Sequence, residues 1–114
     1  MLGFSSQAND LFQKYKVTKL RPDYYLKLSK TGIIIEVERG QTSQNNAALK
    51  DLWKVHICEE AHYLFLFVPM ELKQNKSNPN KIGGKPFNET VNRLSTFFEK
   101  ENYTNVRGLA IFGY

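Results

Sequence analysis

The sequence predicts an α/β domain in which a central mixed β-sheet of four or five strands is flanked by helices, giving three layers. Two patterns support this fold class. Residues on either side of Gly32 alternate in the way that is typical of a β-hairpin. The apolar segment 63–68 lies between two amphipathic segments and is typical of a strand buried on both faces. A hairpin that leads through a helix into such a strand implies a mixed sheet between helices.

The N-terminal half is predicted to form a helix and then the hairpin. Apolar residues recur at helical spacing up to Tyr15, and Ser5 or Ser6 can cap the start of this helix. Gly32 suits the turn between the two hairpin arms. The predicted elements are a helix at 5–15, a short strand at 17–20, and hairpin arms at 24–29 and 33–39.

The C-terminal half is predicted to alternate helices and strands. Leu49, Leu52 and Trp53 belong to the apolar stripe of the first of these helices. The segment after the buried strand is rich in Lys, Asn, Pro and Gly, which predicts a loop. The predicted elements are a helix at 45–60, a strand at 63–68, a loop at 71–86, a helix at 88–100 and a strand at 106–112.

Composition limits the classes of protein to consider. A chain of 114 residues predicts a single domain, 1–114, with a core of its own. The net charge of +5 is compatible with binding a polyanion such as DNA or RNA. The single cysteine, Cys58, excludes an internal disulfide and a multi-cysteine zinc site. No signal peptide or spanning segment is visible, so we expect a cytoplasmic protein that does not bind a membrane.

Three carboxylates stand out in this basic chain. Asp23 precedes the first hairpin arm, and Glu36 and Glu38 lie two residues apart on the second arm, so their side chains share one face. Neighbouring anions repel unless a cation lies between them, and Mg²⁺ prefers such oxygen ligands. We therefore expect the carboxylates to bind Mg²⁺, with Mn²⁺ as a substitute, and the backbone carbonyl of Val37 to complete the ligand shell. Such an ion suits phosphodiester hydrolysis.

The segments Pro22-Asp23 and Glu36-Val37-Glu38 resemble the motif of the PD-(D/E)xK nucleases, the restriction-endonuclease-like superfamily. The resemblance covers roughly residues 4–69 and includes the order of the elements. It implies a restriction-endonuclease-like core in which Asp23 and Glu36 are the metal ligands and catalytic acids.

One position departs from that motif, because Glu38 stands where the family usually has lysine. Some restriction enzymes have the same E-x-E variant and remain active. The resemblance then implies that Glu38 holds a second metal or acts on the attacking water. In other members the positive charge lies on the following helix, which offers Lys50, expected to face the sheet, and Lys54. Lys50, Lys54 and Arg39 all stay open as the replacement for the motif lysine.

The expected function is therefore a Mg²⁺-dependent endodeoxyribonuclease, either restriction-like or specific for junctions or other DNA structures. A chain this small is expected to act as a homodimer or as a domain of a larger nuclease. The segment around Glu36-Val37-Glu38-Arg39-Gly40 also resembles parts of plasmid replication and mobilisation proteins, which suggests mobile-element DNA. The residues expected to contact DNA are Arg39, Gln41, Lys54, Lys73, Lys76, Lys81 and Lys85.

Two other readings of the sequence remain open. The absent motif lysine also fits a nucleic-acid-binding or assembly module that kept this fold and lost cleavage. A small α/β protein with no nucleic-acid role is the third reading. Metal-dependent nicking of DNA distinguishes a nuclease from a module that binds without cleaving. Salt-dependent DNA binding distinguishes either of these from a protein with no nucleic-acid role.

Overall fold

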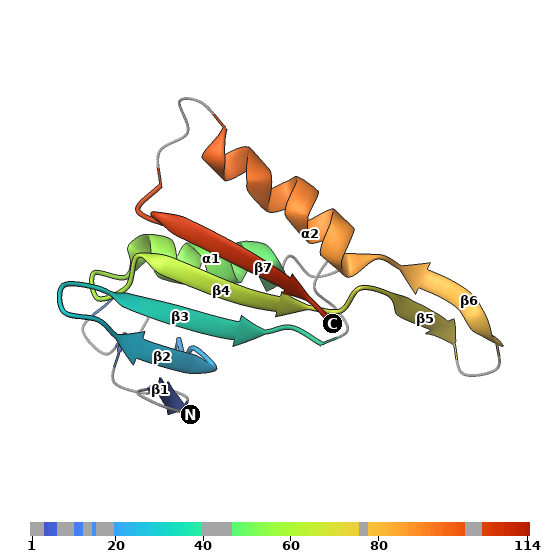
Figure 1. The fold of residues 1–114 in the computed structure, drawn as a ribbon, viewed down its shortest axis with the longest axis horizontal. Coiled ribbons are helices and arrows are strands. Elements are labelled where there is room, and N and C mark those ends of the chain that lie inside the picture. Colours follow the sequence, from blue (N-terminus) through green and yellow to red (C-terminus); the bar gives the residue numbers. More distant parts are fainter. Residues whose placement is uncertain are drawn as a thin grey trace.

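The main feature of the fold is a five-stranded mixed sheet with the strand order β1-β2-β3-β4-β7 (Figure 1). The structure is a computed structural model that describes residues 4–6, 11–12, 15, 20–39, 47–75, 78–99 and 104–114. Pairing is antiparallel between β1, β2 and β3, and parallel between β3, β4 and β7. The strands are β1 (Phe4–Ser6), β2 (Tyr24–Lys27), β3 (Gly32–Val37), β4 (Tyr63–Val68) and β7 (Gly108–Gly113). The predicted α/β class and mixed sheet are confirmed.

Two helices connect the parallel strands, as parallel pairing requires. Helix α1 (Ala47–Ile57) leads from β3 to β4, and helix α2 (Pro86–Ser95) precedes β7. A short 3-10 helix, η1 (Thr96–Phe98), extends α2. The remaining strands, β5 (Leu72–Asn75) and β6 (Asn78–Gly84), pair with each other as a separate antiparallel hairpin that projects from the body (Figure 1).

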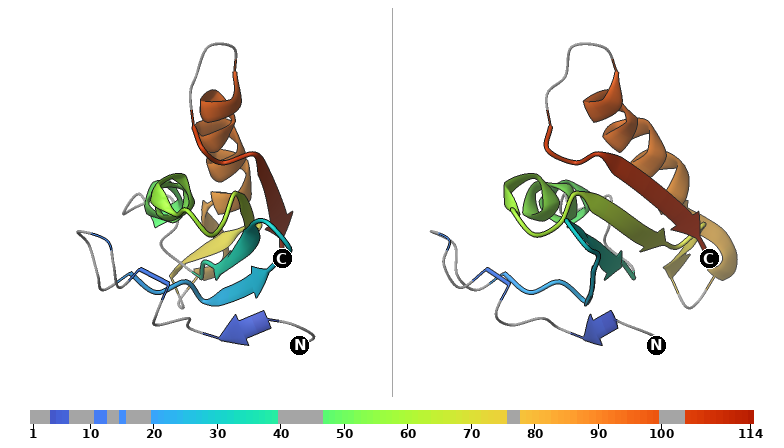
Figure 2. Two further views of the ribbon diagram at one scale, coloured as in Figure 1. Left: turned by 90° about the vertical axis from the view of Figure 1, so that its left-hand side faces the viewer. Right: turned by 60° about the vertical axis from the view of Figure 1, so that its left-hand side comes forward.

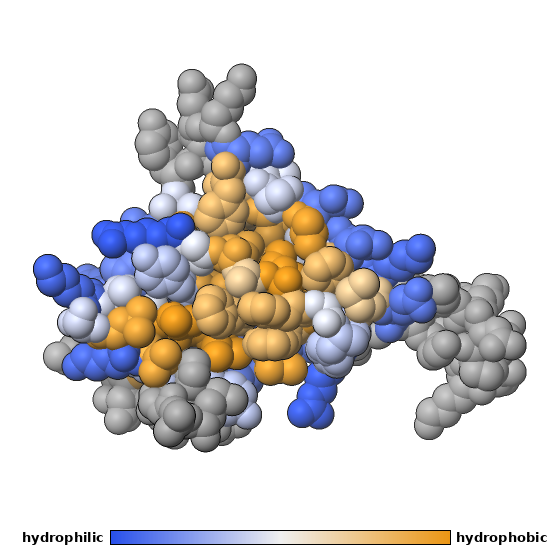
Figure 3. All heavy atoms as spheres, in the orientation of Figure 1, coloured by the Kyte–Doolittle hydropathy of each residue, from blue (hydrophilic) through white to orange (hydrophobic). Residues whose placement is uncertain are grey.

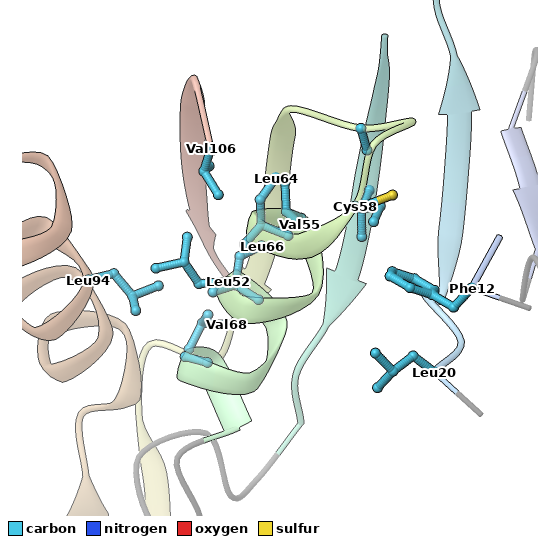
Figure 4. Close-up of a cluster of buried hydrophobic side chains, with 13 residues drawn as sticks. Phe12, Leu20, Leu52, Val55, Cys58, Leu64, Leu66, Val68, Leu94 and Val106 are labelled. Carbon is cyan, nitrogen blue, oxygen red and sulfur yellow. The ribbon is translucent and has the colours of Figure 1, made fainter. Parts of the chain in front are cut away.

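The core lies between the sheet and the two helices. Side chains alternate along β4, so that Leu64, Leu66 and Val68 are fully buried on one face. They meet Leu52 and Val55 of α1 and Leu94 of α2, and Phe12, Leu20 and Cys58 extend the same cluster (Figure 4). Cys58 is thus a buried core residue, as predicted.

Both helices cover the same face of the sheet, as the edge-on views in Figure 2 show. The predicted three-layer arrangement is therefore wrong for the described part of the chain, which has two layers. The physical reason lies in the N-terminal segment. Phe4–Ser6 extends along the edge of the sheet and pairs with β2, where the sequence predicted the start of a helix. Residues 7–10, 13 and 14 of the predicted helix lie outside the described residues.

The second face of the sheet is apolar and partly exposed. By register it presents Ile33, Ile35 and Val37 from β3 beside Tyr63, Phe65 and Phe67 from β4, with Phe112 from β7. The Phe67 and Phe112 rings stack with their centroids 4.8 Å apart. Hydrophobic residues gather over these strands on the face seen in Figure 3. Among the described residues, no helix covers this face.

Three further element predictions need correction. Residues 71–86, predicted as a loop, contain the β5–β6 hairpin, because a segment rich in Asn, Pro and Gly still has enough extended residues to pair. Helix α1 ends at Ile57, earlier than the predicted 60. Leu20 lies outside any strand, and residues 16–19 lie outside the described residues. Among the described residues, no helix is long and apolar enough to cross a membrane.

The difference between the two faces predicts unequal effects of one substitution. Val68 is 0% exposed on the helix-covered face, whereas Val37 is 37% exposed on the other. We expect Val68→Ala to lower the free energy of unfolding by about 2 kcal/mol and Val37→Ala by less than about 1 kcal/mol. Urea denaturation of both variants measures this. Equal losses would show that the apolar face is covered in the protein.

Candidate functional site

Glu36 is a carboxylate on the buried side of the sheet. It lies in β3, beside Leu66 of β4 in the parallel register, and is only 3% exposed. Its position follows from the strand alternation that also buries Ile34. Since an unpaired charge is costly in such surroundings, a carboxylate here needs a partner.

Lys54 of α1 is that partner. Its Nζ lies 3.0 Å from Glu36 Oε1 and 3.4 Å from Asp51 Oδ1, and the residue is 8% exposed. Asp51 and Lys54 are three residues apart, which places them on the same side of the helix. One ammonium group therefore lies between a carboxylate of the strand and a carboxylate of the helix.

Asp23 is held at the same end of β3 by the backbone. Its Oδ2 accepts a hydrogen bond of 2.8 Å from the Val37 N–H. Its own N–H donates a long hydrogen bond of 3.4 Å to Glu36 Oε2. Pro22, which precedes it, is fully buried. Asp23 and Glu36, from the two hairpin arms, thus lie next to each other at the end of β3.

Asp51 was not among the predicted site residues. It is 3% exposed, and its Oδ2 is buried without a hydrogen-bond donor among the described residues. The Glu38 carboxyl group is near enough to Asp51 to raise the pKa of Asp51. Two ionised carboxylates can only accept, so this contact is a hydrogen bond only when one of them is protonated. The two groups therefore repel each other in their ionised forms.

The charges at this site shift the protonation of its members. Burial raises the pKa of Glu36 to about 7, and the Lys54 ammonium limits that rise. Burial also raises the pKa of Asp51 well above its usual range, and the Glu38 and Glu36 carboxylates add to the rise. Burial would lower the pKa of Lys54, but Glu36 and Asp51 outweigh it, so this pKa is raised. Glu36 and Asp51 therefore hold their protons more tightly than free carboxyl groups do, and Lys54 stays charged.

The predicted positive residues are placed unequally. Lys50 is exposed, so its predicted orientation toward the sheet is wrong. Lys54, one turn further along, has the buried position instead, because its side chain continues the face of α1 that packs on β3 and β4. Arg39 is exposed just beyond β3 and forms no ion pair with these carboxylates within the described part of the chain. Gln41 lies outside the described residues.

The remaining predicted residues are in β3, in the β5–β6 hairpin, just before α2, or outside the described residues. The Val37 backbone approaches Asp23 through its N–H group. Lys73 lies in β5 and Lys81 in β6, while Lys85 is exposed immediately before α2. Lys76 lies outside the described residues.

The sequence did contain a signal for Asp51. The buried face of α1 includes Ala48, Asp51, Leu52 and Val55, which recur at the helical spacing of three and four residues. An acid within an otherwise apolar stripe is a buried charge that needs a partner, and Lys54 at the i+3 position is a candidate.

The fit of a divalent cation can be judged from the donors present. In the described part of the chain, no group of three Asp, Glu, His or Cys side chains could hold a metal ion. Mg²⁺, however, is usually bound by one or two carboxylates together with water and substrate phosphate. Asp23 and Glu36 are carboxylates of that kind and lie at the same end of β3, while the Lys54 ammonium lies 3.0 Å from Glu36 Oε1.

Comparison with known proteins adds no assignment to this geometry. No family model matches the sequence, and neither the curated proteins nor the solved structures that were compared give a match.

The raised pKa of Glu36 predicts how stability changes with pH. The unfolded value is 4.5 and the folded value about 7, so the folded state holds this proton more tightly. The stability that protonation contributes is present below about pH 4.5 and is lost as the pH rises through about 7. Without metal, wild type should lose about 3 kcal/mol relative to Glu36→Gln across this window.

Urea denaturation of both proteins in EDTA, at about pH 4.5 and about pH 7.5, measures this difference. Glu36→Gln also serves as the control for the titrating groups that do not contact Glu36; Asp51 and Lys54, whose pKa values Glu36 raises, change with it. A constant difference at both pH values would contradict the buried placement of Glu36.

Proposed function

We propose that this chain is a Mg²⁺-dependent deoxyribonuclease with a restriction-endonuclease-like core. The observation that supports it best is the position of Lys54 Nζ, 3.0 Å from Glu36 Oε1. Glu38 occupies the place of the motif lysine, and Lys54 brings a positive charge to the same acids from the following helix. Lys54 can thus provide the positive charge that the motif normally takes from its lysine.

Each residue has a separate task in this proposal. Asp23 and Glu36 bind the cation, and the Val37 N–H fixes the orientation of the Asp23 carboxylate. Lys54 limits the rise of the Glu36 pKa and places an ammonium group where a scissile phosphate would approach the acids. Mg²⁺ bound there supplies charge neutralisation and a more acidic water molecule. DNA is the proposed substrate, and a homodimer or a larger nuclease is the proposed context.

The second candidate function is a module that binds nucleic acid without cleaving it. Two observations favour it: Lys54 already pairs with Glu36, and the described residues form no group of three side chains that could hold a metal ion. In that case the ion pair is purely structural. The two candidates differ in whether the acids are needed for cleavage.

Nicking of supercoiled plasmid in the presence of Mg²⁺ tests the nuclease proposal. We expect Asp23→Asn, Glu36→Gln and Lys54→Gln each to lower the nicking rate by at least ~100-fold, because each removes charge at the reacting phosphate. Lys50→Gln is the matched control, since it makes the same change on the exposed part of α1 and should nick normally. Circular dichroism checks that each variant folds.

If wild type does not nick, or nicks at the same rate as Asp23→Asn, the nuclease proposal fails. A wild type that binds DNA with normal affinity and never cleaves it would support the second candidate.

The β5–β6 hairpin provides a test of where DNA binds. The ends of β3 and β4 lie side by side, with Val37 opposite Phe67, and the hairpin follows directly after β4 (Figure 1). It therefore leaves the sheet at the C-terminal ends of β3 and β4, where the carboxylates lie. The sequence contains no Asp or Glu between residues 72 and 88, but four lysines. We propose that this hairpin contacts the DNA backbone.

Lys73→Gln/Lys81→Gln should lower the slope of log K against log salt concentration by up to about 2, since each phosphate contact contributes about 0.9. Lys27→Gln/Lys30→Gln is the charge-matched control, because these exposed lysines lie at the β2–β3 turn on the opposite edge. Fluorescence anisotropy with labelled duplex in EDTA measures both slopes. Equal slopes in the two variants would contradict binding by the hairpin.

A further inference from the structure

The face of the sheet that the helices leave open is a continuous apolar surface (Figure 3). In the described strands β2, β3, β4 and β7, no charged side chain belongs to this face by register. To the residues of β3 and β4 named above, β2 adds Tyr24 and Leu26, and β7 contributes Ala110 and Phe112. Val37 is 37% exposed and Phe112 is 42% exposed. Soluble monomers rarely expose a contiguous apolar patch of more than a few hundred Å².

The size of this face can be compared with the area that a dimer needs. Four strands spaced by about 4.8 Å, each about 20 Å long, give a flat outline of about 400 Å². Two copies that cover this outline bury at least about 800 Å² in total, and the relief of the side chains adds to that value. Stable complexes bury about 1,200–2,000 Å², and weak ones bury less. The face is therefore large enough for a reversible dimer that dissociates on dilution.

The distribution of charge favours this face for contact between two copies. The chain has a net charge of +5, so two copies repel each other. Lys27 of β2 belongs to the opposite face by register, and Arg39 and Arg107 lie just outside β3 and β7. A contact through the open face therefore removes no charged group of these strands from water and avoids that desolvation cost.

The two halves of the face also match each other in size. Tyr24 of β2 and Ala110 of β7 lie at the same level of the sheet, that of the Ile35–Phe65 pair. At the level of Phe112, β2 has not yet begun, because Tyr24 is its first residue. A half-turn about an axis that runs along the strands between β3 and β4 places β2 of one copy over β7 of the other. The bulky residue of each half then meets a small or open position of the other half.

From the area, charge and shape of this face we infer that it binds the same face of a second copy in a two-fold symmetric dimer. The two sheets pack face to face about 10 Å apart, with their strands within about 30° of each other. The helices then lie on the two outer sides. Because the contact is isologous, each residue of the face is buried twice. This dimer does not depend on cleavage, but it specifies the surface of the homodimer that the proposed function leaves open.

The same axis has a consequence that rests on the proposed function. A rotation about the strand direction keeps the C-terminal ends of β3 at the same end of the dimer. Asp23 and Glu36 of both copies then lie at that end, on the outer, helix-covered sides of the two sheets. Two sites in this arrangement face one DNA duplex from the same side.

Sedimentation equilibrium of the full chain in EDTA, without DNA, tests the inference. We expect wild type to change from monomer to dimer between about 1 µM and about 1 mM. Phe112→Lys should raise the dissociation constant at least ~100-fold, because symmetry places the new charge in the interface twice. Phe98→Lys is the matched control, since Phe98 is 43% exposed and lies in η1, outside this face. It should dimerise like wild type, and circular dichroism checks that both variants fold.

A pair of opposite charges tests how the two copies are oriented. Tyr24→Glu and Ala110→Lys should each weaken the dimer. The double variant should bind at least ~10-fold more tightly than either single variant, because the axis places residue 24 of one copy opposite residue 110 of the other. Within one chain the two positions are three strand spacings apart, about 14 Å, which is too far for an ion pair. These variants also test the face without changing Phe112.

A wild type that stays monomeric up to about 1 mM overturns the inference, and the face is then covered by this chain itself or by a different partner. A dimer that Phe112→Lys leaves unchanged, or that Phe98→Lys weakens equally, also overturns it and places the contact on another surface. No recovery in the double variant overturns the two-fold arrangement. Each of these results leaves the nuclease proposal standing, because the measurement uses neither metal nor DNA. A wild type that dimerises but does not nick plasmid overturns the proposed function alone.

Discussion

The buried ion pair between Lys54 and Glu36 constrains the rest of the structure. A carboxylate within an apolar layer is stable only next to a positive charge, so α1 must pack on β3 in the rotation that brings Lys54 over the strand. The strand is constrained in turn. A shift of one residue in β3 would move Glu36 to the open face and bring Ile33, Ile35 and Val37 under the helix, leaving Lys54 buried without its partner. The pair therefore specifies both the helix rotation and the strand register.

The parts of the fold that depend on local pattern could be predicted from the sequence. Alternation assigned β2, β3 and β4, and the apolar stripe assigned α1, because each pattern reports directly which side of an element is buried. The N-terminal segment could not be assigned in this way. Phe4 and the apolar residues after it have helical spacing, yet Phe4–Ser6 pairs with β2, and this pairing depends on an edge that exists only in the folded sheet. The β5–β6 hairpin was missed for a similar reason, since its Asn, Pro and Gly residues are equally typical of a loop.

The candidate site shows the same division. Asp23 and Glu36 were predicted because strand geometry alone brings the start of one hairpin arm next to the end of the other. The choice between Lys50 and Lys54 was not accessible, because residues four apart point in nearly the same direction and only the packing of α1 decides which one is buried. Asp51 was accessible in principle, as an acid inside an apolar stripe. Its significance required the contact with Glu38, which joins two elements thirteen residues apart in the chain.

The two faces of the sheet separate the polar chemistry from the apolar surface. The site acids and Lys54 lie toward the helix-covered side, whereas the opposite face presents aliphatic and aromatic residues by register and no charged residue from β3 or β4. A polyanion gains little from such a face, since phosphate is attracted by cations. It gains more at the edge where β3 and β4 end, because Arg39 and Lys85 are exposed there and the basic hairpin leaves the sheet there. That edge is also where Asp23 and Glu38 approach solvent, so DNA bound along it would meet the acids without crossing the apolar face. The open face then remains for an apolar contact that is independent of DNA.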